Sequence, residues 1–274
     1  MRFSFLTMVF LLGVLVAKVP SQSVHLVTWN IQTLGRSKSD AEIGAMARIL
    51  KDADIVAVQE VVGKDPAGAQ AVARLADALD RTGSDWDYRV SDPTTGTAHE
   101  SERYAFLWKT SRVTLLGRPG LVGEFADLVV REPYVARFRW NAGELVLVNF
   151  HAVPHDKQPE REIKVIRSLA SAFGDLPVVF MADWNVVDHH TVFNPLKREG
   201  YRFAVTGQLT TLKKGCVDRQ YRSHGIDNIL FPASLEAIRS GVLDFVGDCH
   251  RLETARMISD HLPVWVELRT ILKP

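Results

Sequence analysis

Histidines, carboxylates and side-chain amides recur in this 274-residue sequence where short apolar runs begin or end. Carboxylate and amide oxygens suit a hard divalent cation, and imidazoles transfer protons near neutral pH. Such a set could bind a metal, orient a phosphate group and move protons. The residues, in chain order, are Asn30, Glu60, Glu102, His151, Asp183, Asn185, Asp227, Asp260 and His261.

Each of these residues has an ordinary structural explanation when it is taken alone. Asn30 could stabilise a turn, Glu60 could be solvated, and Glu102 could belong to a surface charge pair. His151, after a wholly apolar run, is more often a satisfied structural residue. Buried carboxylates, however, cost several kcal/mol each unless they are paired or bind a metal. One site that gathers all these residues around a divalent cation removes that cost.

The segment Asp183-Trp184-Asn185 is more specific than most of the other positions. It follows an apolar run directly, and alternation along a strand would place Asp183 and Asn185 on the same side. Asp183 could then move a proton while Asn185 holds a phosphate oxygen. Asp260 and His261 would point to opposite sides of an extended chain, so one could serve a metal and the other act as a base.

Short runs of strand length position these residues. They are rich in β-branched or aromatic residues, which favour strands. The runs are Val24–Trp29, Ile55–Val58, Tyr104–Trp108, Arg112–Leu116, Leu145–Phe150, Val178–Ala182, Ile226–Phe231 and Leu262–Leu268. Apolar periodicity predicts helices over residues 40–52, 67–81 and 159–173. Because strands outnumber helices and do not strictly alternate with them, we expect a layered α/β domain with mixed sheets over residues 23–274.

The first 22 residues differ in composition from the rest. Arg2 precedes an apolar run over residues 3–17, and Lys18, Pro20 and small polar residues follow it. A charged start, an apolar centre and a polar exit are typical of a secretory signal peptide. The alternative is a membrane anchor, but a span needs about 20 apolar residues and this run is shorter. We therefore expect residues 1–22 to be removed from a secreted or periplasmic protein.

The charge of the chain bears on how it could attract phosphates, and its cysteines bear on whether it contains a disulfide. The chain has 33 basic and 32 acidic residues, and Arg2 and Lys18 lie in the predicted signal peptide, so the remainder carries one more acid than base. Attraction for phosphates must then be local or come from a metal, unlike in a strongly basic nucleic-acid binder. Cys216 and Cys249 are either a disulfide, which export would favour, or two separate thiols.

Several segments together resemble the endonuclease/exonuclease/phosphatase superfamily and, within it, deoxyribonuclease I. They occur in the family's order and cover nearly all of the chain after residue 22. The segment Ser259-Asp260-His261-Leu262-Pro263-Val264 is highly specific, and residues 101–106 and 131–133 point to the deoxyribonuclease I branch. The full set is residues 28–35, 54–61, 101–106, 131–133, 150–154, 182–185, 226–229 and 259–264.

The resemblance implies a four-layer α/β sandwich, with two packed mixed β-sheets flanked by helices and the site at one edge of the sheets. It also implies a divalent metal held chiefly by Glu60, with help from Asn30 and Asp260. Mg²⁺ is the expected ion, Mn²⁺ is a possible substitute, and Ca²⁺ is also possible.

The catalytic groups implied by the resemblance are two histidine–carboxylate pairs. His151 would pair with Glu102 as the acid, and His261 would pair with Asp227 as the base, with Asp183 as the alternative base. A carboxylate bonded to an imidazole fixes its tautomer and favours its charged form. The residues implied to contact the phosphate or the attacking water are Asn30, Arg131, Asp183 and Asn185.

The sequence departs from deoxyribonuclease I where that enzyme inserts an arginine and a tyrosine into the DNA minor groove. Those positions hold Val62 and Glu100, although Lys64 lies close to the first. Glu100 would place an acid against a polyanion. Compensating contacts could come from a basic cluster, which could equally be an ordinary solvated loop. The cluster consists of Lys213, Lys214, Arg219 and Arg222.

We therefore predict a secreted, monomeric, metal-dependent endonuclease that hydrolyses DNA and has no stable membrane association once the signal peptide is removed. An alternative keeps the chemistry but takes a phospholipid or phosphoinositide as substrate. Such an enzyme should expose an apolar hairpin, and none is evident after residue 22. A catalytically silent binding protein is a third possibility, which the complete set of candidate catalytic residues disfavours.

Overall fold

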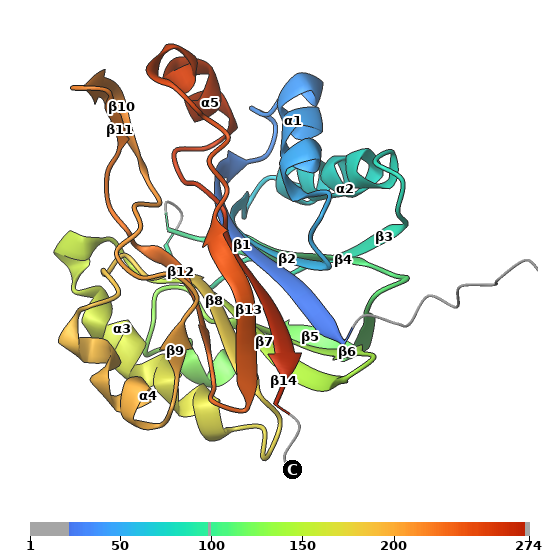
Figure 1. The fold of residues 1–274 in the computed structure, drawn as a ribbon, viewed down its shortest axis with the longest axis vertical. Coiled ribbons are helices and arrows are strands. Elements are labelled where there is room, and N and C mark those ends of the chain that lie inside the picture. Colours follow the sequence, from blue (N-terminus) through green and yellow to red (C-terminus); the bar gives the residue numbers. More distant parts are fainter. Residues whose placement is uncertain (1–21, 98–99, 272–274) are drawn as a thin grey trace, which may run out of the picture.

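A computed structural model describes residues 22–97 and 100–271 of the chain. Two six-stranded sheets pack face to face, and helices lie on the outer face of each (Figure 1). This arrangement confirms the predicted four-layer α/β sandwich. The predicted signal peptide lies outside the described residues except for Gln22, so its removal stays a prediction. Within the described part of the chain, no helix is long and apolar enough to cross a membrane.

The first sheet has the strand order β13-β14-β1-β2-β4-β3. β1 and β2 run parallel, and the other neighbours are antiparallel. The helices α1 (Asp40–Leu50) and α2 (Ala67–Asp80) cover its outer face. The strands are β1 (Ser23–Leu34), β2 (Ile55–Val62), β3 (Trp86–Val90), β4 (Glu102–Lys109), β13 (Leu235–Val242) and β14 (Val264–Thr270).

The second sheet has the order β5-β6-β7-β8-β12-β9, and here only the neighbours β7 and β8 are parallel. Its outer face packs against α3 (Pro159–Ile166), α4 (Asn194–Arg198) and short 3-10 turns. The strands are β5 (Thr114–Leu121), β6 (Tyr134–Trp140), β7 (Gly143–His151), β8 (Val178–Asp183), β9 (Arg202–Phe203) and β12 (Asp227–Phe231). The turns are η1 (Gly123–Phe125), η2 (His155–Lys157), η3 (Arg167–Ser171), η4 (Thr191–Phe193) and η5 (Cys249–Arg251).

A separate two-stranded hairpin, β10 (Leu212–Val217) and β11 (Gln220–Arg222), projects beside α5 (Leu252–Ile258) (Figure 1). Cys216 of β10 and Cys249 of η5 form a disulfide, as the sequence analysis favoured. A disulfide is typical of exported proteins.

Each predicted strand has a counterpart in the structure, but several boundaries differ. β5 begins at Thr114 rather than Arg112, because residues 110–112 turn and the Arg112 guanidinium pairs with Asp54 at 2.9 Å. The third predicted helix ends at Ile166 and continues only as the 3-10 turn η3. Six strands were not predicted from the sequence, namely β3, β6, β9, β10, β11 and β13. Polar or charged residues interrupt the apolar runs in most of them, and β9 is only two residues long.

A network of buried side-chain amides joins the two sheets. Asn149 of β7 and Gln59 of β2 are both fully buried, and Gln59 Nε2 donates to Asn149 Oδ1 at 2.6 Å. Asn149 Nδ2 donates to the main-chain oxygens of Val58 and Ala105, both at 3.1 Å. One amide therefore bonds β2 and β4 of the opposite sheet.

Replacing Asn149 with Ala should lower the free energy of unfolding by about 3 kcal/mol, because the two carbonyls and Gln59 Nε2 lose a buried partner. Urea denaturation measures this change. The matched control is Asn141→Ala, in the exposed turn after β6, which should stay within about 0.5 kcal/mol of the unsubstituted protein. Equal stability of the two variants would contradict a linking role for Asn149.

Candidate active site

The candidate catalytic side chains continue the inner faces of the strands. In β7, Leu145 and Leu147 belong to the core between the sheets, and His151 follows at the same two-residue period. In β8, Met181 belongs to the same core and Asp183 follows it. The same rule places Asn30 of β1, Glu102 of β4 and Asp227 of β12 on inner faces. The site therefore lies where the apolar core ends, at one edge of the sandwich.

Strand register brings three of these residues side by side. His151 is paired with Asp183 across β7 and β8, and Asp183 is paired with Asp227 across β8 and β12. Asp183 and Asp227 are each only 1% exposed. Two buried carboxylates on adjacent strands repel each other unless a positive group or hydrogen-bond donors compensate their charge.

The first histidine–carboxylate pair is His151 with Glu102. His151 Nδ1 lies 2.9 Å from Glu102 Oε2 and 3.2 Å from Oε1. Burial works against charge on both groups, and Arg131 further opposes it on His151. The ion pair outweighs these effects, so the pKa of His151 is raised and the pKa of Glu102 is lowered. The Tyr104 hydroxyl accepts a hydrogen bond from the His151 main-chain N–H at 3.1 Å.

The second pair is His261 with Asp227. His261 Nδ1 lies 2.9 Å from Asp227 Oδ2 and 3.0 Å from Oδ1. Burial opposes charge on the imidazole, but Asp227 and Asp183 outweigh it and raise the pKa of His261 to about 10. Burial, with Asp183, also raises the pKa of Asp227. Both shifts mean that this cluster retains a proton, which offsets the charge of the two carboxylates.

Asp183 lies between the two imidazoles. Its Oδ2 is 3.5 Å from His151 Nε2 and 3.8 Å from His261 Nδ1, and it accepts a hydrogen bond from Asn30 Nδ2 at 3.1 Å. The two pairs therefore form one connected site with Asp183 at its centre.

Two groups of side chains offer ligand atoms for a divalent cation. Asn30 Nδ2 donates to Glu60 Oε1 at 2.9 Å, which leaves the buried Asn30 Oδ1 without a hydrogen-bond partner. An orphaned carbonyl oxygen beside a carboxylate is suited to such a cation. Asp183, Asp227 and His261 also offer ligand atoms within 4.8 Å of one another. The predicted ligand Asp260 is placed differently, because Gln32 Nε2 donates to its Oδ2 at 3.0 Å and the Arg256 guanidinium lies 3.8 Å from the same oxygen.

A cavity of about 460 Å³ opens over these residues. Its lining includes Glu60, Glu102, Arg131, His151, Asp183, Asn185 and His261. Three residues of the lining, Thr33, Glu60 and Asn185, have left-handed backbone φ angles of 49°, 60° and 49°. Such φ values are strained for residues with a side chain, and they cluster at functional sites.

The left-handed conformations explain two placements that strand alternation does not. Alternation in β2 would put Glu60 on the outer face with Val56 and Val58, but the register shifts after Val58 and the φ of Glu60 turns its side chain to the cavity. β8 ends at Asp183, and its Oδ1 accepts the main-chain N–H of Asn185 at 3.0 Å. A turn, and not the predicted strand alternation, therefore brings Asn185 to the side of Asp183.

The sequence profile of the endonuclease/exonuclease/phosphatase family matches residues 27–261, a range that contains every predicted site residue. The chain belongs to this family.

Relatives within the family narrow the class of reaction. A deoxyribonuclease of Thioalkalivibrio sp. (strain K90mix) is 30% identical over 93% of this chain and 74% of its own length. Deoxyribonuclease-1 of Bos taurus is 28% identical over 90% of this chain and 92% of its own length. A solved endonuclease/exonuclease/phosphatase family protein from Bacteroides thetaiotaomicron matches with a TM-score of 0.68 at 17% identity, covering 91% of this chain and 98% of that one. The structural likeness shows the fold, and the relatives' names support a hydrolase of the nuclease or phosphodiesterase type.

Arg131 is buried in this member of the family. Its Nε donates to the main-chain oxygen of His151 at 3.0 Å, and a terminal nitrogen donates to that of Ala152 at 2.8 Å. The guanidinium thus fixes the chain after β7 while it also lines the cavity, so a phosphate clamp could use only part of it.

At the edge of the cavity, the charge of Glu100 is less unfavourable for binding a polyanion than the sequence suggested. Lys64 and Glu100 both line the cavity. Lys157 Nζ lies 2.6 Å from Glu100 Oε1, and this contact lowers the pKa of Glu100. The acid is therefore paired with a cation, and its charge is not presented alone to a polyanion.

Two residues that position the candidate catalytic groups, Thr210 and Glu162, were not predicted from the sequence. Thr210 Oγ1 donates to Asp227 Oδ2 at 2.6 Å and accepts the main-chain N–H of Asp227 at 3.1 Å. Glu162 accepts main-chain N–H groups of Val130 and Val153 beside the site, at 2.7 and 2.8 Å. No sequence signal marks Thr210, which precedes a strand without any motif, whereas Glu162 lies on the apolar face of a predicted helix.

Replacing Glu102 with Gln should lower the pKa of His151 below its ordinary value of 6.5. Once the carboxylate charge is gone, burial and Arg131 both disfavour the imidazolium. Titration of the His151 ring protons by NMR measures the change. Glu100→Gln is the control, because Glu100 pairs with Lys157 and should leave the raised pKa of His151 in place. A pKa that stays raised in Glu102→Gln would identify Asp183 as the controlling charge.

Proposed function

We propose that this protein is a secreted, metal-dependent endonuclease that hydrolyses the phosphodiester bonds of DNA. The observation that carries the proposal is the convergence of two histidine–carboxylate pairs, His151–Glu102 and His261–Asp227, on one cavity with Asp183 between them. The deoxyribonuclease names of its relatives support DNA as the substrate. The disulfide is consistent with export.

Proton transfer is the task of the imidazoles and Asp183. Each imidazole is bonded to its carboxylate through Nδ1, so Nε2 is the nitrogen left to exchange a proton with a substrate. One group must take a proton from water and another must give one to the leaving oxygen. His261 and Asp183 are the two candidates for the base, and His151 is the acid. Because the raised pKa of His261 keeps its imidazole protonated near neutral pH, we propose Asp183 as the base under those conditions and His261 as the base only once it has lost that proton.

Positioning of the phosphate falls to groups on the cavity wall. Arg131 supplies positive charge, and the amide of Asn185 is held in place because its Nδ2 donates to the main-chain oxygen of Ala152 at 3.0 Å. Preorganised charge and donors of this kind stabilise the negative charge that grows on the phosphoryl oxygens.

A divalent cation, Mg²⁺ or Mn²⁺, would be held by Glu60 and by the orphaned Asn30 Oδ1, with help from Asp260. When bound, such an ion neutralises phosphoryl charge and lowers the pKa of a coordinated water. Thr33 N–H donates to Glu60 Oε2 at 3.2 Å, which orients the carboxylate. Ca²⁺ would suit the same class of oxygen ligands.

The protein from residue 23 onward should nick supercoiled plasmid in the presence of Mg²⁺, and a chelator should stop the reaction. The double variant His151→Ala, His261→Ala should lose at least about a thousandfold in rate, because each acid–base group contributes about 10²–10⁴-fold. Gel electrophoresis of the plasmid forms measures the nicking.

The matched control for this assay is His189→Ala, His250→Ala, which removes two histidines outside the cavity lining. It should nick at the rate of the unsubstituted protein. Full activity in the His151, His261 double variant, or no nicking by a folded, metal-supplied protein, would overturn the proposed function.

Added Mg²⁺ should raise the melting temperature, because a ligand that binds only the folded state stabilises it. Glu60→Gln should reduce this rise, and Glu124→Gln, at an exposed position, should not. Differential scanning fluorimetry measures both without reference to activity. A full rise in Glu60→Gln with none in Asp183→Asn would instead place the ion at Asp183, Asp227 and His261.

A further inference from the structure

The hairpin formed by β10 and β11 carries a local excess of positive charge. Residues 212–222 contain four basic residues and one acidic residue, whereas the whole chain has a formal charge of only +1. The hairpin projects from the body of the sandwich beside α5 (Figure 1). Such a local excess is what a near-neutral protein needs if it is to attract a polyanion.

The base of the hairpin is bonded directly to the second catalytic pair. Thr211 forms an isolated β-bridge with His261, and the Leu212 N–H donates to the main-chain oxygen of Asp260 at 2.7 Å. Thr210, one residue earlier, bonds the Asp227 carboxylate. Since a strand rises about 3.3 Å per residue, Lys214 lies about 10 Å along the strand from Thr211.

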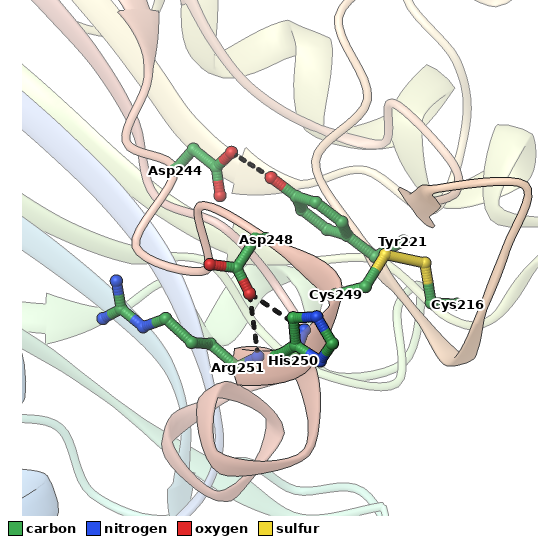
Figure 2. The surroundings of a disulfide bond; sticks show 7 residues. All are labelled: Cys216, Tyr221, Asp244, Asp248, Cys249, His250 and Arg251. Atoms are coloured by element: carbon green, nitrogen blue, oxygen red, sulfur yellow. Dashed lines mark hydrogen bonds between the residues drawn. A yellow bond between two sulfur atoms is a disulfide. The ribbon is translucent and has the colours of Figure 1, made fainter.

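The hairpin is braced along its length. The disulfide joins Cys216, near its tip, to Cys249 of η5, and the Tyr221 hydroxyl bonds to Asp244 (Figure 2). The Arg222 guanidinium also bonds to Asp244. A two-stranded hairpin is only marginally stable without further contacts. These links therefore hold its charges at a fixed position relative to His261.

The turn at the tip holds an arginine in a conformation that favours glycine. Val217 pairs with Gln220, so Asp218 and Arg219 form a two-residue turn, and their φ angles are 51° and 61°. Turns with positive φ at both central residues prefer Asn or Asp followed by Gly. Arg219 is thus unfavourable for the turn itself, which points to a role for its charge.

Three of the four cations are unpaired. The side chains of Lys213, Lys214 and Arg219 make no hydrogen bond or ion pair to another described residue, and Lys214 and Arg219 are exposed. Arg222, in contrast, is held by Asp244. A groove of about 490 Å³ lies along β11, with Arg219 and Arg222 in its lining.

We propose that Lys213, Lys214 and Arg219 bind backbone phosphates of the DNA on one side of the scissile bond. This inference rests on the proposed nuclease function. Because phosphate contacts position a duplex without reading its sequence, cleavage should depend little on base sequence at this end of the site.

The test compares Lys213→Gln, Lys214→Gln, Arg219→Gly with a control that removes three exposed charges at the ends of α1, α2 and α4. The control is Lys51→Gln, Arg81→Gln, Arg198→Gln. Binding of a fluorescent duplex is measured in chelator at several salt concentrations. The hairpin variant should bind at least about tenfold more weakly, and its slope of log Kd against log salt should be shallower by about 2–3. The control should match the unsubstituted protein.

Cleavage assays separate this inference from the function on which it rests. The hairpin variant should lose kcat/KM on plasmid while hydrolysing bis(p-nitrophenyl) phosphate, which has no flanking phosphates, at an unchanged rate. DNA binding that depends on the hairpin, with no cleavage of either substrate, would overturn the nuclease proposal alone. Cleavage and binding equal to those of the control would overturn the hairpin proposal alone. A labelled single strand, run in parallel, shows which form of DNA the hairpin prefers.

The single variant Arg219→Gly distinguishes a DNA contact from a structural role in the turn. Glycine relieves the positive φ, so the melting temperature should stay equal or rise. Duplex affinity should nevertheless fall about threefold or more, with a salt slope shallower by about 1. Unchanged affinity and slope would show that Arg219 contacts no phosphate.

Discussion

Two buried carboxylates on neighbouring strands repel each other, and the rest of the site must compensate their charge. Asp183 and Asp227 are opposed in register, and both are almost fully buried. Their repulsion is compensated by His261, by the amide of Asn30 and by the hydroxyl of Thr210, each of which comes from a different part of the chain. The same unfavourable charge that requires these partners also makes the site receptive to a cation and able to hold protons.

The two sheets make this arrangement possible because the side chains of their inner faces change from apolar to charged at one edge. Apolar side chains fill the space between the sheets, Gln59 and Asn149 bond across it, and the catalytic groups follow at the edge. Glu102, His151, Asp183 and Asp227 are thus each mounted on a strand whose neighbouring inner residues are locked in the core. A rigid support of this kind keeps acid–base groups in register with one another without the ordering of loops.

In the proposed function, the groups that would hydrolyse the substrate and the groups that would contact the rest of it lie on different parts of the fold. The hydrolytic groups lie on sheet strands or next to them, whereas Lys64, the Glu100–Lys157 pair and the β10–β11 hairpin lie on connecting segments around the cavity or beside it. Since the chain is close to neutral overall, the distribution of these few charges matters more than their sum. On this proposal, contacts with the substrate could change while the candidate catalytic groups stay in place.

The sequence alone determined the layers and most of the candidate site, because the two-residue period of a strand is local and places Glu102, His151 and Asp183 at the ends of apolar inner faces. The family motifs added which residues should act together. Only the tertiary structure decided the rest. The left-handed φ of Glu60, the turn at Asn185, the support from Thr210 and the bracing of the hairpin depend on strand order, on register and on contacts between residues distant in the chain. The local periodicity of the sequence does not predict strand order, register or distant contacts, since these arise only when the two sheets pack.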